Sequence, residues 1–307
     1  MFRLSRRGRR NRMRADRFHA TESGEPRLAE PIPCRSWTDL SAWFERRQEQ
    51  WDAESWVFRG QRSSGLAALQ LTTSLERALH RFGLPLAEAP AWEYRILRDF
   101  KRRCHLAATP PSMDSDLEWL ALLRHYGGPA RLLDWTYSFW TAIYFALEGA
   151  RPGQICDIWA LDAGWWRVRS LYPRLQRVVE KHGPNSAEEN HEVLTCKQRP
   201  GVWFLRPFRL NDRLSAQQGS FMLPLDITTS LVGNLAALAP YRERSRHVEL
   251  HQMRVTTELL TTCLSQLQRM NISAITLYPG LTGLARHYDN ALAMPRLFGE
   301  GGRTSRR

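Results

Sequence analysis

The pattern of apolar and polar residues predicts two adjacent helices between residues 117 and 149, the densest stretch of the sequence. Ser115 is suited to cap the first helix, and Glu118 three residues later completes a capping box. Gly127, followed by a second glycine and a proline, ends that helix. The second helix begins near Ser138 and is apolar on nearly every side, which predicts that it is buried.

A short link between these two helices, residues 130–136, brings charges to the base of the buried helix. Arg131 supplies a cation, Asp134 an anion and Thr136 a hydroxyl. Charged side chains are rarely taken inside a protein unless they are paired or used in function. Arg131 and Asp134 are therefore the first candidates for a functional role.

The rest of the chain shows shorter apolar runs and helical spacings. Strands are predicted at residues 56–61, 157–161, 201–208, 213–224, 247–255 and 272–277. Helices are predicted at residues 36–50, 91–104 and 256–270, after 71–77, within 163–200 apart from a loop at 183–186, and through 281–285. Strands scattered between helices without regular alternation indicate the α+β class. We expect one domain over residues 36–290, with a mixed, mostly antiparallel sheet flanked by helices.

Charge and periodicity set the two ends of the chain apart. Residues 1–33 lack hydrophobic periodicity and are predicted to form a disordered basic arm, with residues 291–307 as a flexible tail. The net charge is +13, and residues 1–17 contain eight arginines against one aspartate. Such an arm can hold nucleic acid electrostatically, without reading its sequence. A solvated tail that aids solubility is the alternative.

Cysteine spacing and the length of the apolar runs favour a reduced, cytoplasmic protein. The five cysteines lie far apart, and none forms a C-x-x-C pair. No apolar run reaches the roughly 18 residues of a membrane helix, and no apolar segment follows the N-terminal charges as in a signal peptide. The nine histidines do not show metal-site spacing, so we expect no metal. Glycine-rich phosphate loops and the nucleophile motif of common hydrolases are missing.

Two of the predicted strands carry residues that suit a binding site. Arg59 directly follows three apolar strand residues and can project its planar guanidinium into a cleft to bind an anion. A structural ion pair with Asp134 is the alternative. Gly60 permits an unusual backbone angle or the close approach of a ligand. Gln217 and Gln218 are adjacent on a predicted strand, so one of the two can face a cleft.

Five short motifs in this order resemble the FRG domain family, which takes its name from a (Phe/Tyr)-Arg-Gly motif. The motifs are Phe58-Arg59-Gly60, the stretch from His125-Tyr126-Gly127 to Arg131-Leu132-Leu133-Asp134-Trp135-Thr136, Ala142-Ile143-Tyr144-Phe145-Ala146, Ala216-Gln217-Gln218-Gly219-Ser220-Phe221, and residues 277–285. The resemblance spans roughly residues 36–290. The chain departs from the family pattern at Gly128-Pro129-Ala130, where Ala130 replaces the usual threonine. Within the motifs, the candidate ligand-binding residues are Gly60, His125, Tyr126, Arg131, Gln218 and Phe221.

A second, looser similarity is to arginine-specific ADP-ribosyltransferases, which share the order of a strand arginine, a hydroxyl motif and a third polar strand. The resemblance implies that Arg59 anchors the phosphates of NAD and that Thr136 and Ser138 supply the hydroxyls. Gln217 or Gln218 would occupy the position of the catalytic glutamate. A glutamine brings no negative charge to an oxocarbenium-like transition state, which costs stabilisation. Asp134 is close enough in sequence to the hydroxyls to supply that charge.

Three functions follow from these residues. The first is an NAD-dependent enzyme that transfers ADP-ribose to a protein or nucleic-acid acceptor, or hydrolyses NAD, as a toxin or phage-defence effector. The second is a non-catalytic module that binds a nucleotide or nucleic acid. The third is a buried ion network of Arg59, Arg131 and Asp134 that only holds the fold.

Overall fold

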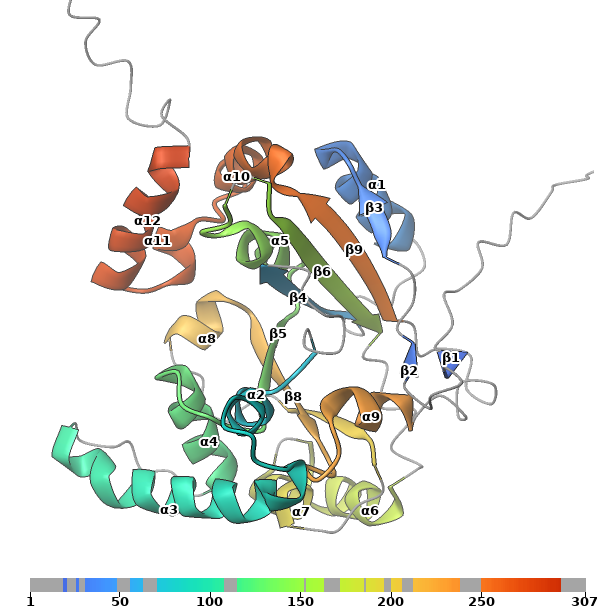
Figure 1. The fold of residues 1–307 in the computed structure, drawn as a ribbon, viewed down its shortest axis with the longest axis vertical. Coiled ribbons are helices and arrows are strands. Elements are labelled where there is room, and N and C mark those ends of the chain that lie inside the picture. The colour runs from blue at the N-terminus through green and yellow to red at the C-terminus, as the bar shows by residue number, and fades with distance from the viewer. Residues whose placement is uncertain are drawn as a thin grey trace, which may run out of the picture.

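A sheet of seven strands forms the centre of the computed structural model (Figure 1). Its strands lie in the order β3 (Ile32–Cys34), β9 (Leu250–Thr256), β6 (Ile155–Asp162), β4 (Trp56–Arg62), β5 (Leu133–Thr136), β8 (Gly219–Pro224) and β7 (Val202–Leu205). Neighbouring strands are antiparallel except for β3 and β9, which are parallel. The α+β class and the mixed, mostly antiparallel sheet predicted from the sequence are therefore confirmed.

The structure describes residues 19–20, 26–27, 31–48, 56–62, 71–107, 115–151, 153–162, 172–184, 186–195, 200–205, 212–237 and 250–293. Predictions for residues 163–171, 206–208 and 247–249 fall outside these ranges, as do most of the predicted arm and tail. Two short segments of the arm, β1 (His19–Ala20) and β2 (Pro26–Arg27), pair with each other as antiparallel strands. Ile32 and Pro33, which were predicted to be disordered, belong to the edge strand β3 because they pair with β9.

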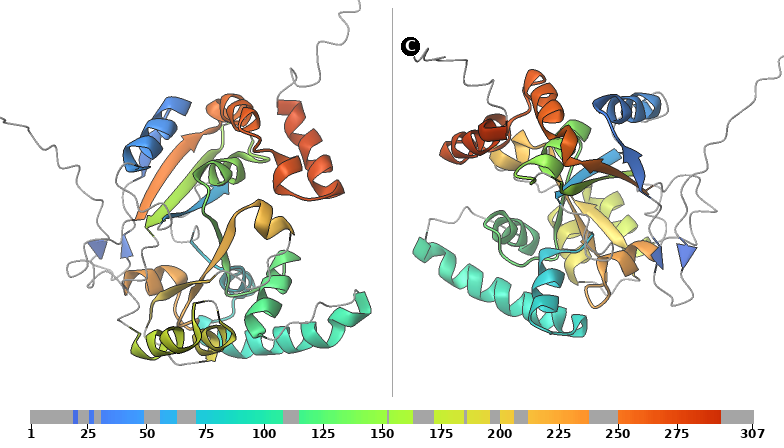
Figure 2. Two further views of the ribbon diagram at one scale, coloured as in Figure 1. Left: turned by 180° about the vertical axis from the view of Figure 1, so that it is seen from behind. Right: turned by 45° about the horizontal axis from the view of Figure 1, so that its top comes forward.

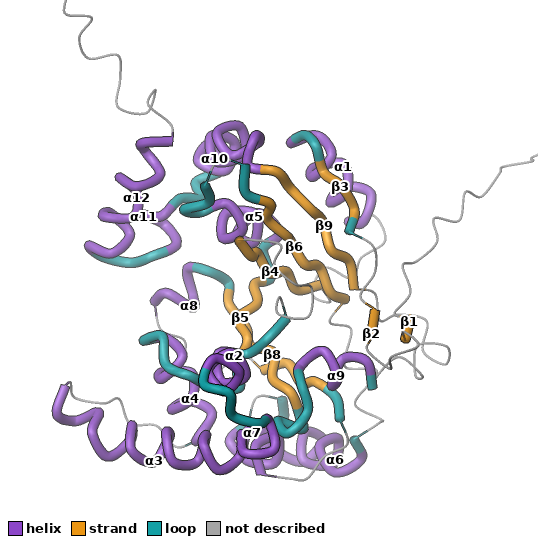
Figure 3. Tube along the Cα trace, in the orientation of Figure 1, coloured by secondary structure: helices purple, strands orange, loops and turns teal. Residues whose placement is uncertain are grey.

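Helices cover both faces of the sheet. They are α1 (Trp37–Gln48), α2 (Ser74–Arg81), α3 (Ala89–Ala107), α4 (Asp116–His125), α5 (Phe139–Leu147), α6 (Pro173–His182), α7 (Ala187–Thr195), α8 (Asp212–Ala216), α9 (Leu231–Ala236), α10 (Leu260–Arg269), α11 (Ala274–Leu277) and α12 (Leu281–Ala293). Figures 1 and 3 show α1, α5 and α10 gathered at one end of the molecule and α3, α4, α6 and α7 at the other. The view from behind in Figure 2 shows the same separation.

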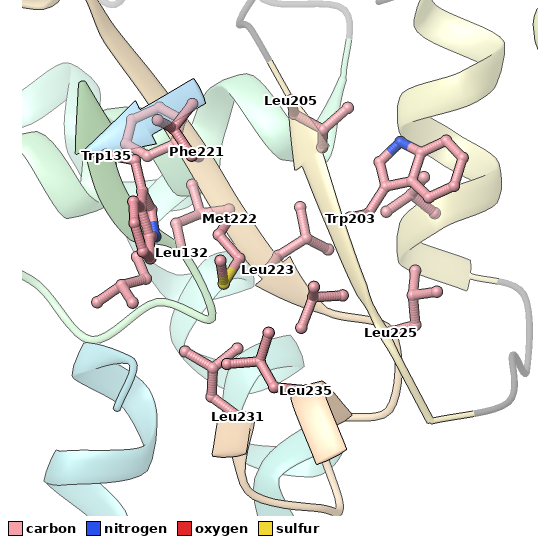
Figure 4. Close-up of a cluster of buried hydrophobic side chains, with 14 of the residues drawn as sticks. Leu132, Trp135, Trp203, Leu205, Phe221, Met222, Leu223, Leu225, Leu231 and Leu235 are labelled. Atoms are coloured by element: carbon pink, nitrogen blue, oxygen red, sulfur yellow. The ribbon is translucent and has the colours of Figure 1, made fainter. Parts of the chain in front are cut away.

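Two hydrophobic cores result from the alternation of side chains along the strands. In β4, Val57 joins one core, which it shares with Trp159 of β6. Its neighbours Trp56 and Phe58 join the other, which packs beneath α1, α5 and α10. Figure 4 shows part of the first core, where side chains of β5, β7 and β8 meet those of α9. Core side chains therefore pack against both faces of the sheet.

Local capping fixes the starts of the two helices that the sequence pattern predicted most clearly. The Ser115 hydroxyl accepts a hydrogen bond from the backbone N–H of Glu118 at the start of α4. The Ser138 hydroxyl accepts one from Thr141 N–H at the start of α5. Seven of the nine residues of α5 are buried, as its apolar sequence predicted. Between these helices, residues 133–136 form the strand β5 rather than a link.

Two predicted elements in the C-terminal part of the chain are wrong. Residues 274–277 form α11 instead of a strand, because Ser273 and Thr276 make a capping box that opens a short helix. Residues 213–218 form α8 and a turn, so the predicted strand shrinks to β8. Gly219 permits this turn, since a Cβ there would lie 2.3 Å from the Leu214 side chain.

The helix predicted at residues 256–270 and the end of the domain also differ from expectation. Thr256 makes no side-chain cap, and a 3₁₀ turn at Thr257–Leu259 precedes α10. The last helix, α12, continues well past the predicted stretch, so the first three residues of the predicted tail are helical. None of the helices in the described part of the chain combines the length and apolar character needed to cross a bilayer.

Candidate functional site

A cleft opens where the two central strands β4 and β5 separate. Their ladder is one residue pair long, Phe58 with Thr136, although β4 pairs with β6 on its other side over seven residues. Two residues further along, Gly60 and Asp134 are not paired with each other. The guanidinium of Arg59 lies in this gap, where its Nη1 donates a hydrogen bond of 2.6 Å to the backbone carbonyl of Asp134. A side chain thus takes the place of the missing ladder hydrogen bonds.

The cleft has a volume of about 740 Å³ and is lined by six segments of the chain. The residues come from β4, α4, β5, α5, the stretch from α8 to the start of β8, and the region of α11 and α12. Eight of the predicted site residues line it, namely Arg59, Gly60, His125, Tyr126, Asp134, Thr136, Gln217 and Phe221. Ser138, Arg131 and Gln218 do not. Eight of the eleven predicted residues therefore lie around one cleft, although they come from segments that are far apart in the chain.

Two arginines at the floor of the cleft, Arg59 and Arg124, approach one aspartate, and the charge of Arg77 on α2 acts on them. Arg124 of α4 pairs with Asp134, with 2.5 Å between its Nη2 and the carboxylate Oδ2. Burial, together with the positive charges of Arg124 and Arg77, lowers the pKa of Arg59 to about 10 despite the opposing effect of Asp134. Burial and Arg124 also lower the pKa of Arg77. Arg59 and Arg124 therefore both approach Asp134, the first at its backbone carbonyl and the second at its carboxylate group.

Two nitrogen atoms in this cluster are buried without a hydrogen-bond partner among the described residues. They are the Nε atoms of Arg59 and Arg124, on the two guanidinium groups that approach Asp134. Buried polar groups in proteins are nearly always hydrogen-bonded, and leaving a charged one unsatisfied is costly. A bound anion would supply these hydrogen bonds.

The hydroxyls and the glutamine that were predicted to contact ligand serve mainly to hold the wall of the cleft. Thr136 Oγ1 donates to the Gln217 carbonyl at 2.7 Å and accepts from Ser138 N–H at 3.0 Å. The Gln217 Nε2 donates to the carbonyl of Leu277 at 3.0 Å. Ser138 caps α5, and Gln218 lies in the turn before β8 with a φ of 47°. These bonds tie β5 to the turn after α8 and to α11.

Position 60 requires a glycine because the backbone of α5, and not a ligand, approaches it closely. A Cβ at this position would lie 1.9 Å from the Ala142 carbonyl oxygen and 2.4 Å from the Ala146 nitrogen. Both atoms belong to the backbone of α5, so β4 and α5 touch directly at this point. The glycine of the Phe-Arg-Gly motif thus sets how deep α5 lies, and its neighbour Arg59 projects from the opposite side of the strand.

Arg131 is separate from the cleft. Its Nε lies 2.8 and 2.9 Å from the carboxylate oxygens of Glu93 in α3, and its Nη2 also contacts that carboxylate. Both side chains are buried. The expected partner Asp134 instead binds Arg124 and, through its carbonyl, Arg59. Arg131 therefore holds α3 against the start of β5.

Replacement of Arg131 by methionine is expected to lower the free energy of unfolding by about 3–5 kcal/mol, because Glu93 would be left as an unpaired buried charge. Urea denaturation followed by circular dichroism measures this change. The double variant Arg131→Met, Glu93→Leu removes both charges and is expected to recover part of the loss. An Arg131→Met variant as stable as the wild type would contradict the assignment.

The mouth of the cleft carries residues that the sequence did not single out. Arg213 of α8, Arg286 of α12 and Tyr278 between α11 and α12 line its upper wall, and α12 and α8 lie on the same side of the molecule in Figure 1. Across from them, the ring of Tyr126 is 75% exposed and packs edge to face with His125. Nothing in the local sequence marks Arg213 as a binding residue, and its segment was predicted to be a strand.

His125 lies within the electrostatic reach of both walls. Partial burial lowers its pKa, the positive charge of Arg213 lowers it further, and Asp134 has the opposite effect. The imidazole is therefore mostly neutral at pH 7. The described residues contain no group of three or more His, Cys, Asp or Glu side chains arranged to hold a metal ion.

These features define an α+β protein whose central sheet parts to form a deep cleft with cationic and aromatic walls. Residues 54–154 match the family model of the FRG domain, and the chain is therefore an FRG domain-containing protein. The matched region includes the motifs from Phe58 to Ala146 and so the floor of the cleft, but the segments that contribute Arg213 and Arg286 follow it. No curated protein and no solved structure matches the chain. The looser similarity to ADP-ribosyltransferases thus has no support from a matched protein.

Proposed function

We propose that the cleft binds a nucleotide through its phosphate groups, with NAD as the candidate that the resemblance suggests. The observation that carries the proposal is the cluster at the floor, where Arg59 and Arg124 approach Asp134 and two buried guanidinium nitrogens have no hydrogen-bond partner among the described residues. A planar guanidinium matches the oxygen atoms of a phosphate group with two parallel hydrogen bonds. A phosphate at this point would provide hydrogen-bond partners for both nitrogens.

The rest of the cleft suits the remainder of a nucleotide. Its volume of about 740 Å³ lies within the range of roughly 300–1,000 Å³ typical of small-molecule sites. Aromatic rings line it at several points, namely Phe58, Tyr126, Trp135, Phe145, Phe221 and Tyr278. The exposed ring of Tyr126 offers a flat surface against which a base can stack, and such stacking contributes about 1–3 kcal/mol per base in nucleic-acid complexes.

Isothermal titration of the full chain with NAD tests this proposal. The wild type is expected to bind, and Arg124→Gln is expected to weaken binding at least about tenfold, because it removes one charged donor. Arg102→Gln is a matched control, since Arg102 is exposed on α3, pairs with Asp99 and does not line the cleft. If neither NAD nor ADP-ribose binds to the wild type, the proposal fails.

A second candidate function is cleavage of the bond between nicotinamide and ribose. It is favoured by Asp134, whose side chain is 45% exposed and lies in the cleft beside Arg59. In such a reaction water or an acceptor group bonds to ribose C1′, nicotinamide leaves with the electrons of the broken C–N bond, and the nucleophile's proton is released. Negative charge near the ribose stabilises the developing oxocarbenium ion. Asp134 provides this charge, whereas Gln217 is neutral and its amide is bound to Leu277.

Release of nicotinamide from NAD distinguishes this second function from binding alone. Asp134→Asn is expected to slow release by about a hundredfold, because the negative charge is lost. The same change makes the cluster more positive, so affinity for NAD should hold or rise. Wild-type protein that binds NAD without releasing nicotinamide would eliminate the catalytic candidate and leave the binding proposal intact. A normal rate in Asp134→Asn would eliminate the role of Asp134.

A further inference from the structure

A second group of arginines lines the cleft on elements other than those of the Asp134 cluster. The carbon centres of the Arg213 and Arg286 guanidiniums lie 4.9 and 4.2 Å from the centroid of the Tyr278 ring. These are distances at which a cation is attracted by the face of an aromatic ring. Arg213 comes from α8 and Arg286 from α12, so two elements far apart in sequence direct their charges to one point.

The Tyr278 ring is a fixed platform for these two guanidiniums. Its hydroxyl donates a 2.7 Å hydrogen bond to the Glu148 carboxylate, and the residue is 4% exposed. Its backbone is confined as well, because a Cβ on Gly283 would lie 2.0 Å from the Tyr278 carbonyl oxygen. The ring of Phe145 packs against it edge to face, with 6.2 Å between centroids. The arginines are therefore held in a defined geometry rather than on a mobile surface.

This group carries one positive charge that the described residues do not balance. Arg286 pairs with Glu148, with 3.2 Å between its Nη1 and the carboxylate Oε1. Arg213 forms no ion pair with any carboxylate in the described ranges, and its guanidinium lines the cleft. The group therefore contains two guanidiniums and one carboxylate, which binds Arg286 and also accepts the hydrogen bond of Tyr278. The arrangement can accept an anion from the cleft side.

The two cationic groups are distinct positions within one cleft. The floor group belongs to β4, β5 and α4, whereas the second group belongs to α8 and the region of α11 and α12. His125 lies within reach of both, because Arg213 and Asp134 act on its pKa in opposite directions. A ligand that touches both groups would pass His125 between them.

We propose that Arg213 and Arg286, held against Tyr278, form a second anion subsite, so that the nucleotide bound in this cleft carries two separate phosphate positions. This inference rests on the proposed function, since the floor group holds the first phosphate. It favours ligands such as NADP over NAD and adenosine bisphosphates over AMP, because only the former place a phosphate apart from the 5′ position. The extra phosphate gains charge-assisted hydrogen bonds that a monophosphate cannot make.

Titration with paired ligands tests the second subsite in the full chain. Adenosine 2′,5′-bisphosphate and adenosine 3′,5′-bisphosphate are compared with AMP, and NADP with NAD. At least one bisphosphate is expected to bind the wild type about tenfold or more tightly than AMP. Arg213→Gln is expected to reduce that preference to about twofold or less, with a much smaller loss of affinity for AMP than for the bisphosphate. The control Arg102→Gln is expected to alter neither, and equal melting temperatures show that each variant is folded.

The outcomes separate this inference from the function on which it rests. Binding of AMP without preference for either bisphosphate would overturn the second subsite and leave nucleotide binding at the floor intact. An equal loss of AMP and bisphosphate affinity in Arg213→Gln would also overturn it, because the residue would then act on the whole cleft. Failure of the wild type to bind AMP, NAD or any bisphosphate would overturn both.

Discussion

Replacement of Gly60 by alanine is expected to lower the free energy of unfolding by about 3 kcal/mol or more. The added Cβ would lie 1.9 Å from the Ala142 carbonyl oxygen, and backbone atoms of α5 cannot turn aside as a side chain can. Overpacking of this kind typically costs about 1–3 kcal/mol when side chains can adjust, and more when they cannot. Urea denaturation of the purified variant measures the change.

Gly83→Ala is the matched control for this substitution. Gly83 has a φ of +66°, and a Cβ there would meet nothing within 4 Å. The loss of stability in Gly83→Ala therefore measures only the cost of placing a non-glycine residue in a left-handed backbone conformation, about 1–2 kcal/mol. A Gly60→Ala variant no less stable than Gly83→Ala would contradict the direct contact between β4 and α5.

Replacement of Arg59 by lysine is expected to weaken binding of ADP-ribose by about a hundredfold. Lysine cannot donate to the Asp134 carbonyl and also present a planar pair of donors to a phosphate. The surroundings disfavour a cation, since burial and the charges of Arg124 and Arg77 lower the pKa at this position. A lysine begins from a lower intrinsic pKa than arginine, near 10.4, so a downward shift leaves part of it neutral near pH 7. Isothermal titration measures the loss.

The charge of the substituted lysine also makes the expected affinity depend on pH. A lysine with a lowered pKa gains its proton as the pH falls, so the affinity of Arg59→Lys should improve from pH 8 to pH 6 relative to the wild type. Arg102→Lys on the exposed face of α3 serves as control and should bind like the wild type. Wild-type affinity in Arg59→Lys at pH 8 would show that the guanidinium at the floor does not hold the phosphate.

The sequence predicted the floor of the cleft because its residues sit in short motifs at the ends of clear elements. Arg59 follows an apolar strand, and Asp134 and Thr136 precede an apolar helix, so local pattern was enough to select them. In the structure these segments and Gln217 line the same cleft. What the pattern could not show is that the hydroxyl of Thr136 and the amide of Gln217 are already bound to neighbouring backbone.

Pairings between distant residues account for most of what the sequence did not reveal. Arg131 is close to Asp134 in the chain, yet it pairs with Glu93, which is 38 residues away on α3. Nothing in the local sequence distinguishes Arg124 from other helix residues. Only the packing of its helix brings it to Asp134. Arg213 and Arg286 gather on Tyr278 through the docking of α8 and α12, which no periodicity indicates. Such pairs depend on tertiary packing and not on local propensity.

The short elements near the C-terminus show how local signals compete. Residues 272–277 contain β-branched and aliphatic residues that favour a strand, but the capping box of Ser273 and Thr276 starts a helix there. At residues 213–218 the chain turns instead of extending, and Gln218 adopts a left-handed φ of 47°. The two glutamines consequently do not alternate across a strand.

The most direct test of the cleft is the difference in affinity between AMP and adenosine for the wild-type chain. If the arginines at the floor bind the phosphate, AMP should bind at least about a hundredfold more tightly than adenosine, and added salt should reduce the difference. Equal affinities for the two compounds, or a difference that salt leaves unchanged, would contradict phosphate recognition by Arg59 and Arg124.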